Sequence, residues 1–178
     1  MTNNEKSYYV VGFADGEGSF NCSWRKREDY LIGWKVAPVF NISQKERAIL
    51  AVIKDHLKCG TIRFRKDGVW AYEVDNSQAL INTIIPFFQK FRFLSQKKQR
   101  DFARFIKMVD LIYQGNKSKT YQDLTTLLEL VSDVEAQNSR KYTDKQILDR
   151  AADFWSKNQA KIVAKNKNYV VNHSPLTT

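Results

Sequence analysis

Three of the seven glycines in this 178-residue chain fall within one short segment, Tyr9–Phe20, which reads YVVGFADGEGSF. The residues from Glu5 to Asp15 have the composition of a short helix, for which Asn4 is a candidate N-cap and Gly16 and Gly18 are candidate terminators. Gly12 and Gly16 are four residues apart, so this helix has a flat strip that another backbone could approach closely. Membrane helices pack closely at glycines with this spacing, which offers an analogy for this helix.

Two carboxylates, Asp15 and Glu17, come at the C-terminal end of this expected helix. Each is unfavourable beside the negative end of the helix dipole, by about 0.3–1 kcal/mol. A bound divalent cation would offset that cost. Two cysteines and two histidines in the whole chain are too few for a disulfide framework, a cysteine-rich zinc site or histidine-based catalysis.

The periodicity after the glycine segment alternates between strand and helix signals. Apolar residues recur at every second position near 20–25, 31–43, 60–66 and 69–75, which predicts four strands. Helical spacing is found in 44–57 after a possible Ser43 cap, from Ser77 onward with a possible kink at Pro86, and in 95–114. The expected fold is α+β, with the order αββαββα, one four-stranded antiparallel sheet and C-terminal helices near 120–157. We expect a core over 1–115, a helical extension of the same domain over 116–160 and a basic, loosely ordered tail over 161–178.

The net charge of +10 is unevenly distributed along the chain. Residues 25–66 hold eleven basic and four acidic residues, and residues 89–107 hold seven basic residues and one acid. Such clustering indicates a surface that binds a polyanion, with nucleic acid as the leading partner and a simply soluble basic surface as the alternative. No apolar run reaches the length of a membrane span, and the polar start MTNNEKS does not resemble a signal peptide. We therefore expect an intracellular protein without a membrane partner.

The side of the expected sheet that faces away from the helices is polar. Long donor and acceptor side chains on a twisted antiparallel sheet suit reading of the DNA major groove, although a solvated outer face is the simpler alternative. The candidate DNA-binding residues are Asn21, Ser23, Arg25, Arg27, Lys35, Asn41, Arg63, Arg65 and Glu73.

The segment Val10–Phe20 resembles the LAGLIDADG motif of homing endonucleases, in its form ending G-F-x-D-G-[DE]-G-S-F. The order of elements over residues 5–115 agrees with that family. The motif occurs once, and the resemblance implies a homodimer whose motif helices meet through small residues. The implied interface residues are Val11, Gly12, Asp15 and Gly16, with Asp15 read as structural.

The resemblance also implies a catalytic site. Glu17 matches the metal-binding acid of the family and the Gly16 carbonyl is a second ligand, with Mg²⁺ as the cofactor and Mn²⁺ as a substitute. Gln44 is implied to hold the attacking water. Arg47 matches a position near the phosphate, with a surface role as the alternative. Lys97 or Lys98 matches the basic residue near the scissile phosphate, and Lys97 is slightly favoured.

These expectations describe a site-specific, Mg²⁺-dependent double-strand DNA endonuclease that cuts a long pseudo-palindromic target and takes no small-molecule substrate. Two alternatives remain open at this point, a maturase that binds intron RNA and a DNA-binding protein that does not cleave. The resemblance suggests an intron- or intein-associated gene, often in a mitochondrion or chloroplast.

Overall fold

The computed structural model describes residues 2–30, 33–114, 121–132 and 142–171. The chain forms two compact units: unit 1 comprises Met1–Ser23 and Ala37–Gly115, and unit 2 comprises Trp24–Val36 and Asn116–Thr178. Compared with the expected ranges, unit 2 also takes in the turn between the first two strands. No helix in the described ranges is long and apolar enough to cross a membrane.

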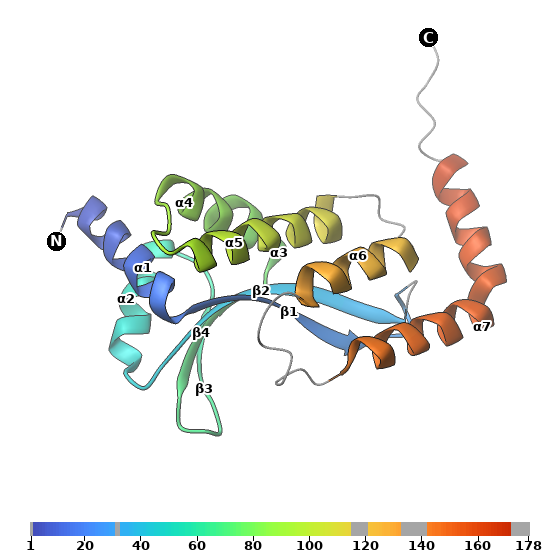
Figure 1. Ribbon diagram of the computed structural model, residues 1–178, viewed down its shortest axis with the longest axis horizontal. Helices are drawn as coiled ribbons and strands as arrows, with labels where there is room; N and C mark the ends of the chain where they lie inside the picture. Colours follow the sequence, from blue (N-terminus) through green and yellow to red (C-terminus); the bar gives the residue numbers. More distant parts are fainter. Residues whose placement is uncertain (1, 31–32, 115–120, 133–141, 172–178) are drawn as a thin grey trace, which may run out of the picture. The chain divides into compact units, whose positions relative to one another are not determined.

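The first helix, α1, spans Asn3–Glu17 (Figure 1). Its N-cap is Thr2 and not Asn4, because Thr2 and Glu5 form a capping box: the Thr2 hydroxyl accepts from Glu5 N (3.2 Å), and the Glu5 carboxylate accepts from Thr2 N (2.7 Å). Gly18 ends the helix, and a Cβ at this position would lie 2.5 Å from the Ala14 carbonyl oxygen. A glycine is therefore required where α1 passes into the first strand.

Four antiparallel strands form one sheet in the order β1-β2-β4-β3, which confirms the predicted fold class. The strands are β1 (Gly18–Lys26), β2 (Trp34–Gln44), β3 (Thr61–Phe64) and β4 (Trp70–Val74). Trp34, Val36, Phe40 and Ile42 are buried on alternate positions of β2, as the period of two predicted. Ile32, assigned to the same face, lies outside the described residues. Phe64, predicted to share the apolar face of β3, is 59% exposed because it lies at the end of this short edge strand.

The second helix, α2, spans Arg47–Leu57 and begins later than predicted. Ser43 does not cap it, because β2 continues through Gln44 and the N-cap position is taken by Glu46, which makes no side-chain cap bond. Leu50, Ile53 and Leu57 are its buried residues, whereas Val52 is 46% exposed. The sequence spacing predicts Ile49, Val52, Ile53 and Leu57 as the apolar face, so the buried face of α2 is rotated relative to that prediction.

The third helical region combines α3 (Ser77–Ala79), a π-helical turn η1 (Leu80–Ile84) and α4 (Ile85–Lys90). Its N-cap is Asn76 and not Ser77, since the Asn76 side chain accepts from Ala79 N (3.1 Å). The π turn ends at Ile84, two residues before Pro86, which lacks the N–H that a regular α-helix would use there. The irregularity predicted at Pro86 is therefore present.

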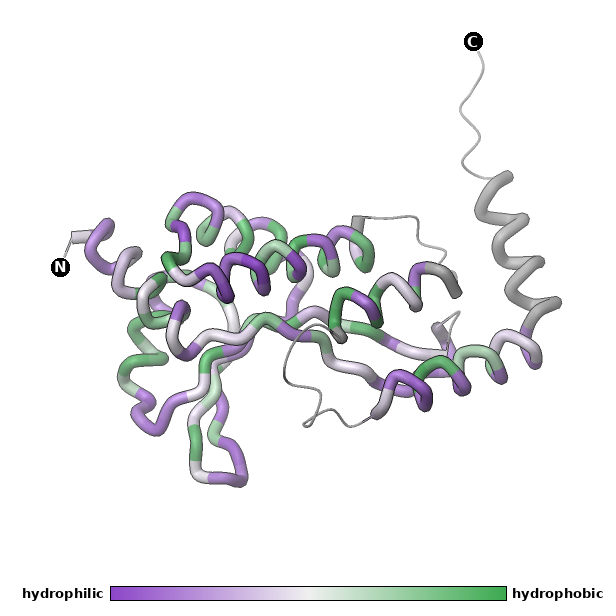
Figure 2. Tube along the Cα trace, in the orientation of Figure 1, coloured by the Kyte–Doolittle hydropathy of each residue, from purple (hydrophilic) through white to green (hydrophobic). Residues whose placement is uncertain are grey.

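The long helix α5 spans Gln96–Val109, is capped by Ser95 and continues into a π turn, η2 (Asp110–Gln114). Its first turns are hydrophilic and its later turns carry the apolar residues (Figure 2). The helical spacing predicts Phe102, Phe105, Ile106 and Val109 on one apolar side; Phe102, Phe105 and Val109 are buried, Ile106 is only partly buried, and Met108 is buried in addition.

The core of unit 1 is an aromatic cluster around Phe20 of β1. Its ring lies 5.0–5.8 Å, between centroids, from five other rings. Those rings belong to Phe40, Phe88, Phe93, Phe102 and Phe105. The cluster packs β1 and β2 against α4 and α5, which lie on one side of the strands in Figure 1. Each fully buried ring contributes about 1.5–3 kcal/mol or more to folding.

Unit 2 contains α6 (Tyr121–Ser132) and α7 (Asp144–Val171). Within this unit Trp34 is anchored by a hydrogen bond from its Nε1 to the Ile147 carbonyl (3.1 Å) and by the Arg150 guanidinium over its ring (5.8 Å). Residues 161–171, expected to belong to a loosely ordered tail, are instead part of α7, which continues to Val171. Residues 172–178 lie outside the described part of the chain.

Candidate active site and nucleic-acid interface

The C-terminal end of α1 is joined to the start of α5 through Asp15 and Ser95. Asp15 Oδ2 accepts hydrogen bonds from Leu94 N and Ser95 N, both at 3.0 Å, and Asp15 Oδ1 accepts one from the Ser95 hydroxyl. Ser95 Oγ in turn accepts from Lys98 N (3.2 Å) and caps α5. Burial raises the pKa of Asp15, but these hydrogen bonds and the Lys98 charge outweigh it, and the pKa lies below its ordinary value. These contacts give Asp15 the structural position that the sequence suggested.

Lys98 reaches from α5 to the end of α1. Its Nζ donates a hydrogen bond to the Gly18 carbonyl oxygen, and the side chain is half-buried, whereas Lys97 is exposed. Burial lowers the pKa of Lys98, and the charges of Asp101, Asp15 and Glu17 offset this only in part. The bond to Gly18 places the Lys98 ammonium at the end of α1 that carries Glu17.

Glu17 is the last residue of α1 and is exposed, as is Gly16 before it. Among the residues that the structure describes, the Glu17 carboxylate has no hydrogen bond or ion pair, although its charge acts on Lys98. The donors at this helix end are a carboxylate and backbone carbonyls, which are the hard oxygen ligands that Mg²⁺ prefers. No three metal-ligating side chains gather anywhere in the described ranges. The donors at the end of α1 thus fit such an ion in chemistry, and Glu17 is the exposed carboxylate there, because the Asp15 carboxylate is bound to Leu94 and Ser95.

Gln44 is the last residue of β2. Its Oε1 accepts from the backbone N–H of Lys45 (2.8 Å). The Ser23 hydroxyl of β1 donates a hydrogen bond to the Ala37 carbonyl of β2 (3.5 Å). Since the two strands are antiparallel, Gly18, five residues before Ser23, lies close to Ile42, five residues after Ala37. Gln44 therefore ends its strand near the level at which α1 ends.

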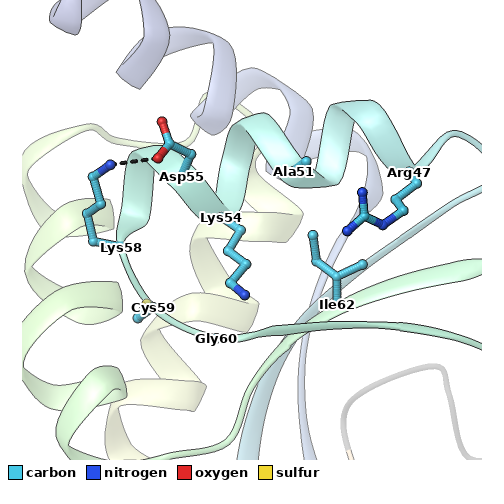
Figure 3. A pocket seen from close by; sticks show the side chains of 8 residues that line it. All are labelled: Arg47, Ala51, Lys54, Asp55, Lys58, Cys59, Gly60 and Ile62. Carbon is cyan, nitrogen blue, oxygen red and sulfur yellow. Dashed lines mark hydrogen bonds and ion pairs between the residues drawn. The ribbon is translucent and has the colours of Figure 1, made fainter.

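Arg47, the other predicted catalytic residue, lies in a different environment. Its guanidinium carbon is 5.5 Å from the centre of the Trp70 ring, and its side chain lines a pocket between α2 and β3 (Figure 3). Within the described part of the chain, none of the Arg47 side-chain contacts involves the end of α1. The structure brings together Glu17 and Lys98 but gives Arg47 no contact with them.

The exposed side of α1 contains the glycine strip, Gly12 and Gly16. Both glycines are exposed, and a Cβ added at either meets no described atom within 4 Å. Tyr9, one turn earlier, is 41% exposed. The other two residues expected at an interface are used within the chain: Val11 is 5% exposed in the core and Asp15 binds Ser95. Among the described residues, the glycine strip is therefore an open surface.

The predicted DNA-binding residues lie on strands and in the first turn, and several contact one another. Arg63 of β3 forms an ion pair with Glu73 of β4 (2.5 Å), and Asn41 is the register partner of Glu73. Arg65 pairs with Asp67 (2.7 Å) and donates to the Ser43 hydroxyl (3.3 Å). Two further candidates bond within unit 1: Asn21 Nδ2 donates to Ser19 Oγ, and Ser23 Oγ donates to the Ala37 carbonyl. In unit 2, Arg27 forms an ion pair with Asp29. Arg25 and Lys35 lie at the ends of β1 and β2 that belong to unit 2.

Sequence reasoning missed the partners that organise the site. Sequence reasoning did not single out Ser95, although a serine directly before an amphipathic helix is a recognisable N-cap signal. The bond between Asp15 and Ser95 spans 80 positions, and no local pattern encodes it. The charged neighbours of His56 in the sequence predict a surface position. The residue is partly buried, and its Nε2 lies 2.9 Å from the hydroxyl of the buried Ser7.

The sequence of this chain is similar to those of known endonucleases. A family model described as LAGLIDADG endonuclease matches residues 10–109, more than half of the chain. A probable intron-encoded endonuclease 2 of Neurospora crassa is 34% identical over 125 residues, covering 68% of this chain and 27% of that protein. The homing endonuclease I-ApeII of Aeropyrum pernix is 26% identical over 79% of this chain and 86% of its own length.

A solved structure gives the same result for the fold. The archaeal intron-encoded homing endonuclease I-Vdi141I, complexed with DNA, superposes with a TM-score of 0.74 at 29% identity. The superposition covers 86% of this chain and 98% of that one. This chain therefore spans about a quarter of the fungal relative but nearly the whole of the archaeal endonuclease chain.

Proposed function

Since this chain belongs to the LAGLIDADG endonuclease family, we propose that it is a homing endonuclease that cuts both strands of a specific, long and pseudo-palindromic DNA site. The observation that carries the proposal is the placement of an exposed carboxylate, Glu17, at the foot of a helix whose glycine strip is open. The relatives named above support the same class of reaction.

The residues at the end of α1 have distinct roles in this proposal. Glu17 and the Gly16 carbonyl would hold Mg²⁺, or Mn²⁺ in its place, because both ligands are hard oxygen donors. When bound, such an ion lowers the pKa of an attacking water and stabilises a leaving oxygen during phosphodiester hydrolysis. Gln44, at the end of β2, would orient the attacking water by hydrogen bonding.

Lys98 would provide positive charge next to the scissile phosphate. Its ammonium is held at the Gly18 carbonyl, one residue beyond Glu17, so it needs little reorganisation to act there. A preorganised cation in a partly buried position stabilises the charge that develops on the phosphate more strongly than a solvated one. Asp15 fixes this geometry indirectly through Ser95, whose hydroxyl caps the helix that carries Lys98.

We further propose that the active enzyme is a homodimer in which the glycine strips of two α1 helices face each other. The described part of each chain has one exposed carboxylate at the end of α1, that of Glu17, whereas double-strand cleavage needs an active site on each strand. The absence of a side chain at Gly12 and Gly16 permits close backbone approach.

The polar face of the sheet would read the DNA. Arg63, Glu73 and Asn41 come from three neighbouring strands and are close enough to act on adjacent base pairs. Arginine and lysine contacts to phosphates would set affinity, and contacts to base edges would set sequence preference. An intron-associated origin, in an organelle genome or elsewhere, belongs to the same proposal and is supported by the intron-encoded relatives.

The purified protein provides the test when incubated with fragmented genomic DNA and Mg²⁺, followed by sequencing of the cut ends. One recurring site with cuts on both strands is the expected result. The Glu17→Gln variant should still bind that site in a gel shift and should leave it uncut. Cleavage by this variant at the wild-type rate would remove Glu17 from the proposed site.

A further inference from the structure

The β3–β4 hairpin has a second face whose chemistry differs from the one proposed to read DNA. Arg63 lies on one side and forms the ion pair with Glu73. Ile62 and Phe64 alternate with it and therefore lie on the other side. Ile62 lines the pocket between α2 and β3, which places that pocket on the opposite face from Arg63.

The pocket, which we call the α2–β3 pocket, is strongly basic. Its volume is about 450 Å³, and its charged lining residues are Arg47, Lys54, Lys58 and Asp55. Asp55 is paired with Lys58 (2.7 Å), so three cations face one carboxylate. Figure 3 shows the Lys54 ammonium directed toward the backbone at Gly60 and the Arg47 guanidinium directed toward Ile62. A pocket with this charge suits a phosphate group.

A pair of aromatic rings, one exposed and one partly buried, lies beside this pocket. Phe64 is 59% exposed and its ring centre is 4.9 Å from that of Trp70, its register partner on β4. Arg47 links the pair to the pocket, since its guanidinium carbon is 5.5 Å from the Trp70 ring. Aromatic rings next to a basic groove are a recurring arrangement in proteins that bind single strands, because unpaired bases stack on the rings while the phosphates follow the cations.

We propose that the α2–β3 pocket and the Phe64–Trp70 pair bind single-stranded nucleic acid. The strand's phosphates occupy the pocket near Lys54, and an unpaired base stacks on Phe64. A duplex does not fit this arrangement, since its bases are already stacked on one another and offer only their edges. The site lies on the opposite sheet face from the proposed duplex contacts, so this binding does not depend on the cleavage reaction.

Fluorescence anisotropy with labelled oligouridine and oligothymidine of about 12 nucleotides, a length within the usual range for such sites, tests the proposal. Phe64→Ala should weaken binding of the single strand about tenfold by removing a stacking surface. Lys54→Ala should also weaken it and should reduce the slope of log K against log salt by about 0.7, the value for one phosphate contact on a single strand. Lys107→Ala, which removes an exposed charge from α5, is the matched control and should change neither quantity by as much.

The RNA and DNA probes separate the two sources of such a strand, and a preference for oligouridine would assign the site to RNA. Phe64 and Lys54 are exposed, so both variants should keep the wild-type melting temperature. The same variants should cut duplex DNA like the wild type, which keeps a failure here distinct from a failure of the proposed endonuclease function. No binding of either probe, or equal losses in Lys54→Ala and Lys107→Ala, would overturn the proposal. Parallel loss of duplex binding would overturn it as well.

Discussion

The Lys98 ammonium donates a hydrogen bond to the carbonyl oxygen of Gly18, the residue that directly follows Glu17. This bond connects the start of α5 to the end of α1 and holds a positive charge beside the exposed carboxylate. Lys97 is exposed one position earlier on the same helix. The sequence slightly favoured Lys97, whereas we propose Lys98 as the residue near the scissile phosphate, because its ammonium is bound at the end of α1.

Replacing Lys98 should therefore reduce cleavage far more than replacing Lys97. We expect Lys98→Met to lower kcat by about 10²–10³-fold, the usual cost of losing one preorganised stabilising group. Lys97→Met is the matched control and should retain most of the activity. Single-turnover cleavage of the identified target measures both, and a larger loss for Lys97→Met would assign the role to that residue instead.

Asp15 should stabilise the fold in a pH-dependent way. Its carboxylate accepts bonds from Leu94 N and Ser95 N, so Asp15→Asn should lower the free energy of unfolding at pH 7 by about 1–2 kcal/mol. Because the pKa of Asp15 is lowered in the folded state, this contribution is complete above the unfolded pKa of about 3.9 and is lost as the pH falls through the folded value. Urea unfolding at pH 7 and near pH 3 measures the difference. A gap between wild type and variant that widens toward acid pH contradicts this account.

Gly12→Ala should have opposite effects on the single chain and on the dimer. Alanine is favoured over glycine in a helix by about 0.8–1.0 kcal/mol, and the added Cβ meets no described atom within 4 Å, so thermal stability at low protein concentration should rise. At a close helix–helix contact the same methyl group would separate the two backbones. Sedimentation velocity should show weaker dimerisation, and unchanged dimerisation would place the interface elsewhere.

The ion pair between Arg63 and Glu73 should matter for DNA sequence preference and little for stability. Both side chains are partly exposed, so Glu73→Ala should change the free energy of unfolding by less than about 1 kcal/mol. Freed from its partner, Arg63 can make other contacts to base edges, and preference should change at one position in each half-site. Cleavage of a target library with single-base substitutions measures this, and an unchanged profile would exclude the pair from base reading.

The sequence predicted the parts of the fold that depend on local periodicity. Alternation in β2 correctly identified Trp34, Phe40 and Ile42 as core residues, since one side of a strand must face the helices. Helix boundaries were less predictable: Thr2 caps α1 because of its reciprocal bonds with Glu5, and Asn76 competes successfully with Ser77 as the cap of α3. Each depends on one or two hydrogen bonds that several neighbouring residues could make.

The residues of the candidate site also fall into two groups, those that a local motif predicts and those that only the structure places. The motif carrying Glu17 and Gly16 is contiguous, so the end of α1 was recognisable from sequence. The choice between Lys97 and Lys98 depends on which face of α5 turns toward β1, and that is set by the packing of Phe102 and Phe105 against Phe20. Arg47 could not be placed because β2 extends to Gln44 and shifts the start of α2. Side chains whose position depends on contacts distant in sequence require the structure.

The central claim is that two chains each contribute one Glu17 to a joint double-strand cut. Its most direct test is a mixed dimer of one wild-type and one Glu17→Gln subunit, purified through two different affinity tags and incubated with supercoiled plasmid carrying the target and Mg²⁺. The account predicts that the mixed dimer binds the site but cannot linearise the plasmid in one binding event and at most nicks one strand, while the wild-type dimer linearises it. Linearisation by the mixed dimer at the wild-type rate would contradict the account.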